Sequence, residues 1–297
     1  MNKLKALFGI MRVPFLALTP ACVLLGVGAA TWMGSRINGL QVALLLVAAV
    51  CAHISVNAFN EYFDFKSGLD AHTRRTPFSG GSGTLPARPE TARLALLTAW
   101  SAFAVTALIG SYFVWLRGMA LLPLGLLGLF MLVAYTPWLV RSPFLCLIAP
   151  GLGFGPVMVM SVAFALTGVF SWTALVASLV PFFLVSDLLL LNQFPDVEAD
   201  WSVGRRHFPI LIGRKASSLI YGAFLLAAYL TIGLGVAFKL LPAISLIGLL
   251  GAVIALPAGI NAFRYSDDIG RLTPSLGMNV LLNLATPLLV GIGLFLK

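Results

Sequence analysis

Charged side chains are scarce in this sequence: Asp, Glu, Lys and Arg together make up 10% of its 297 residues. Hydrophobic residues make up 60%, and the mean hydropathy is +0.99. A soluble protein has no core large enough to bury so high an apolar share, because its surface needs polar and charged groups. The composition therefore excludes a soluble globular protein and indicates one that spans a membrane.

Cysteine is equally scarce. Cys22, Cys51 and Cys146 lie in apolar runs, at spacings that fit neither a disulfide framework nor a metal site, so we interpret them as small packing residues. A cleavage site of small residues is also missing after the basic N-terminus, so we expect the first apolar run to be retained. Because low-complexity stretches are absent, we expect a single transmembrane domain over residues 1–297.

Long apolar runs are what the chain has in abundance. Each is about 20 residues long, enough to cross a hydrocarbon layer roughly 30 Å thick. The runs do not alternate polar with apolar residues, which predicts helices rather than a membrane barrel. We expect an all-α, polytopic membrane protein with about nine transmembrane helices around a central cavity. The predicted spans are residues 14–32, 40–60, 94–116, 119–139, 143–167, 172–193, 216–238, 240–263 and 275–296.

The distribution of basic residues predicts the orientation of these helices. With the N-terminus inside, 15 of the 19 Lys and Arg residues fall on the cytoplasmic side, and four fall on the other: Arg36, Arg117, Lys239 and Lys297. Positive charge is held on the cytoplasmic side of bacterial membranes. We therefore expect a multi-pass protein of the bacterial inner membrane. Its net charge of +9 fits contact with anionic membrane lipid and gives no reason to expect nucleic-acid binding.

Most acidic residues gather in two short stretches with related spacing. The first is Asn60-x3-Asp64-x5-Asp70, and the second, 132 positions later (192 − 60), is Asn192-x3-Asp196-x3-Asp200. An arginine pair and a proline follow each stretch, Arg74-Arg75 in the first case and Arg205-Arg206 in the second. We interpret this as an internal duplication that carries two Asp-rich motifs, with pseudo-repeats over roughly residues 14–139 and 143–263 and a ninth helix over 275–296.

Carboxylates at the end of a membrane span are costly to bury and are usually functional. Two facing groups of carboxylate and amide oxygens form an all-oxygen ligand set, which suits a hard cation such as Mg²⁺, or Mn²⁺, completed by substrate phosphates. We predict Asp64, Asp70, Asp196 and Asp200 as the catalytic carboxylates. The predicted metal ligands are these four together with Asn60 and Asn192.

Basic residues flank both stretches. Guanidinium groups bind phosphate oxygens in pairs, so this pattern predicts binding of a diphosphate. Between the two stretches, Ser79-Gly80-Gly81-Ser82-Gly83 adds small residues that allow close approach to phosphate, although the loop lacks the lysine and spacing of a P-loop. The predicted diphosphate-binding residues are Lys66, Arg75, Arg141, Arg205 and Arg206.

The two motifs resemble those of the UbiA superfamily of intramembrane aromatic prenyltransferases. Tyr135-Thr136-Pro137 with Arg141 is similar to the family's tyrosine and basic diphosphate-binding position, which adds Tyr135 to the predicted site. Gly204-Arg205-Arg206 is similar to its Gly-Lys/Arg run. Two departures are Glu61, where Asp is common, and His207, where Thr is common.

This resemblance implies Mg²⁺-dependent transfer of a prenyl chain from a polyprenyl diphosphate to an aromatic acceptor, at a site on the cytoplasmic side. The five residues between Asp64 and Asp70 resemble the 1,4-dihydroxy-2-naphthoate branch of menaquinone biosynthesis more than the 4-hydroxybenzoate branch. Homogentisate, a tetrapyrrole or a lipid phosphate are alternative acceptors. A membrane transporter is the alternative from another class, although its polar site would be expected near the midplane.

Three residues are candidates for the acceptor pocket. His53 and Asn57 precede Asn60 at helical spacing, so a continuous helix places all three on the face of Asp64. Asp187 is the one carboxylate inside a predicted span. For His53, hydrogen bonding between helices is an equal alternative, and it is the preferred interpretation of Asn261, Asn279 and Asn283.

Overall fold

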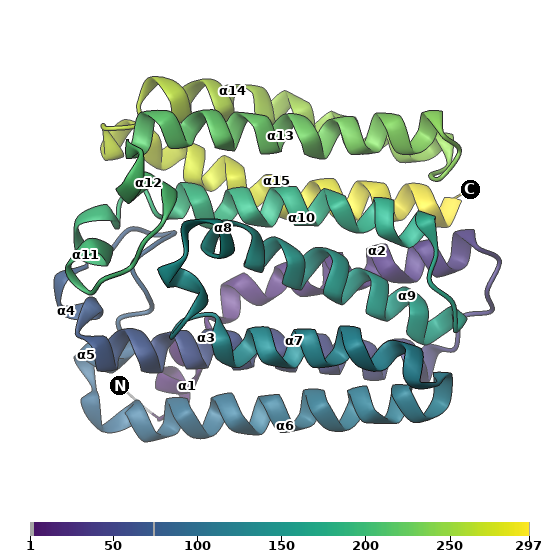
Figure 1. Cartoon of the computed structure of the whole chain (residues 1–297), viewed down its shortest axis with the longest axis horizontal. Helices are drawn as coiled ribbons and strands as arrows, with labels where there is room; N and C mark the ends of the chain where they lie inside the picture. Colours follow the sequence, from purple (N-terminus) through teal and green to yellow (C-terminus); the bar gives the residue numbers. More distant parts are fainter. Residues whose placement is uncertain (1–2, 74, 297) are drawn as a thin grey trace.

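The computed structural model describes residues 3–73 and 75–296, and every regular element in them is helical, which confirms the all-α class (Figure 1). The long helices run side by side along one axis of the molecule. In chain order, with short 3₁₀ and π segments marked η, the elements are α1 (Lys3–Met11), η1 (Val13–Ala17), α2 (Leu18–Trp32), α3 (Gly39–Ser67), α4 (Leu69–His72), α5 (Thr84–Ala87), η2 (Pro89–Thr91), α6 (Ala92–Arg117), η3 (Met119–Leu121), α7 (Leu122–Ala134), η4 (Leu139–Arg141), α8 (Pro143–Leu152), η5 (Gly153–Val159), α9 (Met160–Thr167), α10 (Trp172–Asn192), α11 (Val197–Ser202), α12 (Phe208–Leu211), α13 (Gly213–Ala237), η6 (Ala243–Gly251), α14 (Ala252–Arg264) and α15 (Ile269–Leu296).

Within the described residues, eight helical segments are long and apolar enough to cross a membrane, so the prediction of nine full spans is corrected to eight. The predicted span 119–139 contains instead a shorter apolar helix, Met119–Ala134. It ends there because Pro137 disfavours helical geometry at the residue before it. The eight segments are Val13–Trp32, Gly39–Ser67, Pro89–Arg117, Pro143–Thr167, Trp172–Asn192, Gly213–Ala237, Ala243–Arg264 and Ile269–Leu296.

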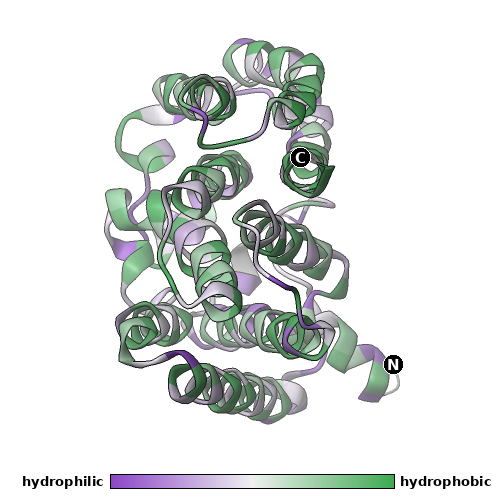
Figure 2. Cartoon of the chain, turned by 90° about the vertical axis from the view of Figure 1, so that its right-hand side faces the viewer, coloured by the Kyte–Doolittle hydropathy of each residue, from purple (hydrophilic) through white to green (hydrophobic). Residues whose placement is uncertain are grey.

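The outer surface of the bundle is apolar. Viewed along the helices in Figure 2, hydrophobic residues cover outward-facing as well as inward-facing sides of the helices. Large tryptophans are exposed near the helix ends, among them Trp115, Trp138, Trp172 and Trp201. Tryptophan is enriched where a membrane meets water, and so apolar a surface is suited to lipid. The protein is a multi-pass membrane protein.

Helix α3 is longer than the sequence predicted. It ends at Ser67, seven residues beyond the predicted end of its span (67 − 60), because Gly68 adopts a left-handed conformation (φ 79°) that closes the helix. At the other end, the side chain of Asn38 accepts hydrogen bonds from the backbone amides of residues 40 and 41. The extra turns keep Asn60 and Asp64 on one continuous helix.

Small residues bring the span Pro143–Thr167 against α10. A Cβ atom at Gly151 would clash with the carbonyl oxygen of Phe182, and one at Gly155 would lie 2.5 Å from the carbonyl oxygen of Ser178. Two glycines four residues apart allow the two backbones to approach closely. The span is π-helical over η5, where Pro156 interrupts the regular hydrogen-bond pattern.

Arg117 connects three helices by hydrogen bonds at the end of the bundle away from the acidic motifs. Its Nε donates a hydrogen bond to the carbonyl oxygen of Ala165 at 2.7 Å, and one terminal nitrogen donates to the carbonyl oxygen of Leu166 at 3.0 Å and to Gln41 at 3.2 Å. The carbonyls belong to the last turn of α9, where a positive charge is favourable. Arg117 therefore links α3, α6 and α9.

Replacing Arg117 with alanine should lower the melting temperature of the detergent-solubilised protein. The expected loss is about 1–3 kcal/mol, because charge-assisted hydrogen bonds are lost at a partly buried position. Arg36, an exposed arginine at the same end of the bundle, is the matched control, and Arg36→Ala should change stability by less than about 0.5 kcal/mol. Equal melting temperatures for the two variants would show that the Arg117 contacts contribute nothing specific.

Candidate active site

A cavity of about 790 Å³ lies among α2, α3, α6, α7, η5 and α10. Its walls are mostly apolar along the helices, and its carboxylates gather at one end, where α3 and α10 finish. The predicted site residues that line it are His53, Asn57, Asn60, Asp64, Asp70, Tyr135, Asn192, Asp196, Asp200 and Arg205. The cavity therefore joins both Asp-rich motifs to an apolar interior.

All six predicted metal ligands meet at the polar end of this cavity. From the first motif, Asn60 and Asp64 lie on the last turns of α3, and the turn at Gly68 places Asp70 on the short α4. From the second motif, Asn192 is the last residue of α10, and Asp196 and Asp200 lie at and within α11. Two stretches far apart in sequence thus supply one group of oxygen atoms.

Arg205 connects the two motifs. One terminal nitrogen forms an ion pair with Asp64 of the first motif, and the other donates to Oδ1 of Asp200 in the second at 2.9 Å. The other oxygen of Asp200, Oδ2, lies 3.0 Å from Nε2 of His207. Asp64 and Asp200 are almost fully buried, so a single guanidinium offsets two carboxylates that have little contact with solvent.

Negative charge remains in excess at this end of the cavity. Burial, together with the nearby charges of Asp64 and Glu61, raises the pKa of Asp70 to about 6. Burial, followed by the charge of Asp200, raises the pKa of Asp196 to about 7. Burial opposes the charge of Arg205, but Asp64 and Asp200 outweigh it and raise the pKa of this guanidinium. A cation at this end would relieve the repulsion among the carboxylates.

The oxygens of the site suit a cation that takes part of its coordination from elsewhere. Asp70 Oδ2 and Asn192 Oδ1 are buried and have no hydrogen-bond partner in the described structure. Among residues 3–73 and 75–296, no three His, Cys, Asp or Glu side chains are grouped closely enough to hold one ion. Mg²⁺ is characteristically bound through one or two carboxylates together with water and substrate phosphates, so the arrangement fits it.

The loop over residues 79–83 covers the polar end. Ser79 donates a hydrogen bond to Oδ1 of Asp196 at 3.4 Å, and the amide and hydroxyl of Ser82 donate to the two oxygens of Glu61 at 2.8 and 2.7 Å. Gly81 (φ 72°) and Gly83 (φ 71°) take left-handed conformations that only glycine adopts without strain. The loop lines the cavity, with backbone amides close to the acidic group.

Four of the predicted diphosphate-binding residues lie outside the cavity. Lys66, Arg75, Arg141 and Arg206 are exposed and do not line it. The Arg75 guanidinium lies against Gly83 of the loop. Arg74, which precedes it, lies outside the described residues. Of the predicted basic residues, the structure thus brings Arg205 alone into the described cavity.

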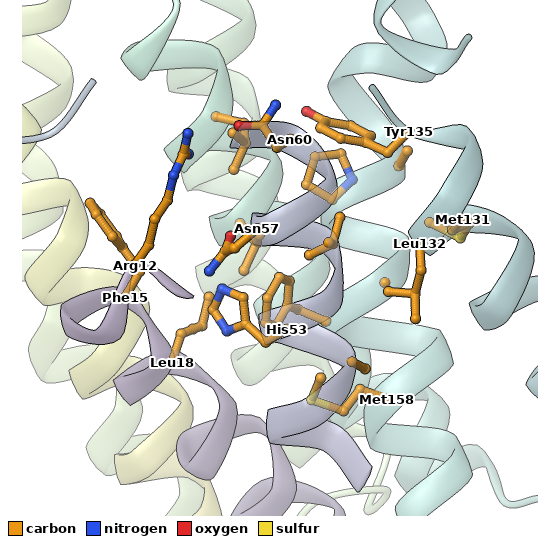
Figure 3. A pocket seen from close by; sticks show the side chains of 18 of the residues that line it. Arg12, Phe15, Leu18, His53, Asn57, Asn60, Met131, Leu132, Tyr135 and Met158 are labelled. Atoms are coloured by element: carbon orange, nitrogen blue, oxygen red, sulfur yellow. The ribbon is translucent and has the colours of Figure 1, made fainter. Parts of the chain in front are cut away.

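The candidates for the acceptor pocket divide into two groups. Asn57 and His53 line the cavity about one and two turns, respectively, below Asn60 (Figure 3). Nδ1 of His53 lies 2.8 Å from the Thr19 hydroxyl, and its ring packs edge-on against Phe154 at 4.8 Å. Asp187 is completely buried outside the cavity, where its backbone carbonyl accepts a hydrogen bond from Asn279.

An apolar arm extends the cavity away from the acidic end. It is lined by α3, η3, α6 and α7, and at Gly110 and Gly125 a side chain would meet nothing within 4 Å. Composition cannot separate these residues from lipid-facing ones, since both are apolar, and only the packing of the helices identifies them. The residues at this end include Leu45, Ile109, Phe113, Leu121, Leu126 and Leu129.

Comparison with known proteins identifies this architecture. Residues 19–272 match the UbiA prenyltransferase family. The chain belongs to this family. It is 27% identical over 198 residues to the 1,4-dihydroxy-2-naphthoate octaprenyltransferase of Bacillus subtilis (strain 168). That match covers 66% of this chain and 62% of the relative, so the chain spans less than two thirds of that protein's length.

Solved structures share the fold. A UbiA homologue from Aeropyrum pernix K1, in its apo form, superposes with a TM-score of 0.72 at 21% identity over 96% of this chain and 98% of its own. A UbiA homologue from Archaeoglobus fulgidus bound to GPP and Mg²⁺ gives a TM-score of 0.61 at 15% identity, over 98% of this chain and 100% of its own. At these identities the likeness shows the fold.

Membership of the UbiA prenyltransferase family favours an enzyme over the alternative of a transporter. The two departures from the family's motifs have structural counterparts. Glu61 does not line the cavity and binds Ser82 and Arg12 instead, while His207 supports Asp200. Arg12 is a cavity residue that motif spacing missed. The one feature of the sequence that could have indicated it is that Arg12 is a basic residue shortly before Pro14, where a helix is expected to be interrupted.

Arg205→Ala should lower prenyl transfer by about one to two orders of magnitude, because a charge-assisted hydrogen bond contributes roughly 1.5–3 kcal/mol. Arg206→Ala is the matched control: the neighbouring side chain is exposed, and turnover should stay within about threefold of the parent. Turnover per folded molecule, measured on detergent-purified protein, checks both. Equal losses of turnover in the two variants would show that Arg205 contributes no more to the reaction than the exposed Arg206.

Proposed function

We propose that this protein transfers a prenyl group from a polyprenyl diphosphate to an aromatic acceptor in the presence of Mg²⁺ or Mn²⁺. One observation carries the proposal: a single cavity has six carboxylate and amide side chains at one end and an apolar arm between membrane-spanning helices at the other. A prenyl diphosphate has the same two parts, a charged head and an apolar tail. Family membership and the GPP-bound homologue from Archaeoglobus fulgidus support it.

The metal site is proposed for the oxygens that the structure leaves available. Asp70 and Asn192 carry buried oxygens without partners, Asp196 is held by Ser79 through one oxygen, and Asn60 and Asp64 line the cavity beside them. When bound, Mg²⁺ would supply positive charge that neutralises the diphosphate and makes it a better leaving group. We propose Asp64, Asp70, Asp196 and Asp200 as the catalytic carboxylates.

The protein's own residues would bind and orient the charged head. Arg205, fixed by Asp64 and Asp200, stabilises the negative charge that develops on the diphosphate as its carbon–oxygen bond breaks. Tyr135, from the turn after α7, lines the same end of the cavity. The exposed Lys66, Arg75, Arg141 and Arg206 are proposed to attract the anionic substrate from outside, since charges of one sign around an entrance raise the local concentration of the opposite charge.

The acceptor would react below the diphosphate. His53 and Asn57 present polar groups to the cavity there, beside the ring of Phe154, and the surrounding apolar walls exclude water that would capture the allylic cation. The electron-rich ring would attack the prenyl carbon as its bond to the diphosphate oxygen breaks, and the released diphosphate would take the proton that the ring then loses. Asp187, buried outside the cavity, is proposed to act on this pocket through the packing of α10 rather than by contact.

We propose 1,4-dihydroxy-2-naphthoate as the acceptor, which would place the reaction in menaquinone biosynthesis. The Bacillus subtilis relative and the five-residue spacing between Asp64 and Asp70 support it. We also propose a location in the bacterial inner membrane with the acidic end toward the cytoplasm, on the basis of the basic residues at that end. The two motif-bearing halves, residues 14–139 and 143–263, are proposed to derive from a duplication.

Removal of the divalent cation should abolish the reaction. EDTA should lower prenyl transfer at least about a hundredfold, and so should Asp64→Asn or Asp196→Asn, because an amide coordinates without supplying the charge that offsets the cation. Glu198→Gln is the matched control, since Glu198 lies on the same α11, is largely exposed and pairs with Arg214. Parental activity in either aspartate variant would remove that residue from the metal site.

A panel of acceptors tests the substrate. Purified protein with Mg²⁺ and a polyprenyl diphosphate should prenylate 1,4-dihydroxy-2-naphthoate with a kcat/KM at least about tenfold above that for 4-hydroxybenzoate or homogentisate, as expected for a difference of roughly 1.4 kcal/mol in transition-state binding. Mass spectrometry of the prenylated products measures this. A preference for another acceptor would overturn the acceptor while leaving prenyl transfer in place, and transfer to none would overturn the proposed function.

A further inference from the structure

Arg12 stands at a break between two helices, in a backbone conformation that few non-glycine residues adopt. It follows α1 and precedes η1 with φ 51° and ψ 50°, in the left-handed region. The carbonyl oxygen of the preceding residue, Met11, accepts a hydrogen bond from the side chain of Asn57 at 3.0 Å, which ties the break to α3. Strained backbone of this kind persists where the surrounding structure holds it and is concentrated at functional sites.

The side chain of Arg12 is fixed from one edge. Its Nε donates to Oε1 of Glu61 at 2.7 Å, and Glu61 is 1% exposed. Both oxygens of Glu61 are further held by Ser82, so the carboxylate cannot turn away. The Arg12 guanidinium is therefore held in one orientation by a buried partner that lies outside the cavity.

The opposite edge of the guanidinium remains for a ligand. Arg12 lines the cavity, and Figure 3 shows it across the pocket from Tyr135 and Met131, with its guanidinium near the level of Asn60. Among the described lining residues, Arg12 and Arg205 are the only lysines or arginines, and Arg205 uses both terminal nitrogens on Asp64 and Asp200. The recorded ion pair of Arg12 uses Nε, which leaves its two terminal nitrogens.

We propose that Arg12 is a substrate-binding residue that holds an oxyanion of a bound substrate through its two terminal nitrogens, and that Glu61 positions it. Two nitrogens in a plane match the two oxygens of a carboxylate or a phosphate. The inference rests on the proposed function, in which the cavity receives two such groups: the carboxylate of the aromatic acceptor and the terminal phosphate of the prenyl donor.

The test measures binding directly and uses variants that keep the buried charge balanced. Arg12→Gln alone would leave the charge of Glu61 buried and unpaired, so the main variant is the double substitution Arg12→Gln with Glu61→Gln. Arg12→Lys keeps the charge and loses the planar pair of donors. Arg88→Gln is the matched control, since Arg88 lies at the same end of the chain's bundle, pairs with Glu90 and does not line the cavity.

Three probes distinguish the source of the oxyanion: 1,4-dihydroxy-2-naphthoate, naphthalene-1,4-diol, which lacks the carboxylate, and inorganic pyrophosphate with Mg²⁺. Calorimetric titration of the detergent-purified protein measures the Kd of each. If the Kd of the naphthoate rises about tenfold or more in the double variant and in Arg12→Lys, while the Kd of the diol is unchanged, Arg12 binds the acceptor's carboxylate. Equivalent weakening of pyrophosphate assigns it to the diphosphate.

Either pattern supports the proposal, and in turnover it should appear as a raised KM for the affected substrate with kcat within about threefold. Glu61→Gln, which keeps the charge of Arg12 but loosens it, should raise the same KM by a smaller factor. The proposal would be overturned if the folded double variant, like the Arg88→Gln control, bound all three probes with unchanged Kd values. Arg12 would then have only a structural role, in holding α1 in place. Because binding is measured without turnover, failure of the wild type to transfer prenyl groups would be a separate result.

Discussion

The ion pairs of Arg205 are the interaction on which the rest of the site depends. They join Asp64, at the end of α3, to Asp200, on α11, and so hold together two segments whose helices would otherwise meet with like charges facing each other. In a low-dielectric interior, carboxylates at this spacing repel strongly unless a cation lies between them. A guanidinium fixed by the chain offsets part of that repulsion, and under the proposed function a divalent cation with its phosphate ligands would offset the charge that is left.

The same constraint explains how the polar end is closed. Asp70 and Asp196 lie on short elements beyond the ends of the long helices, where the backbone can turn, and the loop over residues 79–83 folds across them. Glu61, which does not itself line the cavity, holds that loop through Ser82 and at the same time holds Arg12. One motif on α3 thus serves two purposes: Asn60 and Asp64 line the cavity, and Glu61 holds the loop.

The sequence was sufficient for the fold class and for the meeting of the two motifs, since apolar length and the i, i+4 and i+7 spacing act along single helices. It was not sufficient for the number of full spans, because Met119–Ala134 is apolar throughout and its end depends on a turn at Pro137. Proximity in sequence was also a poor guide to which arginines reach the site. Arg205 and Arg206 are adjacent, yet Arg205 lines the cavity and Arg206 is exposed outside it. Arg12 reaches the site only through tertiary packing, which no local pattern encodes.

The apolar arm restricts the kind of ligand that the charged end of the cavity can bind. Polar groups collected at a membrane surface alone would serve a soluble anion equally well, whereas here the same cavity continues between α3, α6 and α7 toward the opposite end of the bundle. A ligand that fills it must carry charge at one end and hydrocarbon at the other, and it must enter from lipid or from the interface. Under the proposed function, the apolar walls of the arm would both bind the tail and keep water from a cationic intermediate, so the two effects would follow from one feature of the packing.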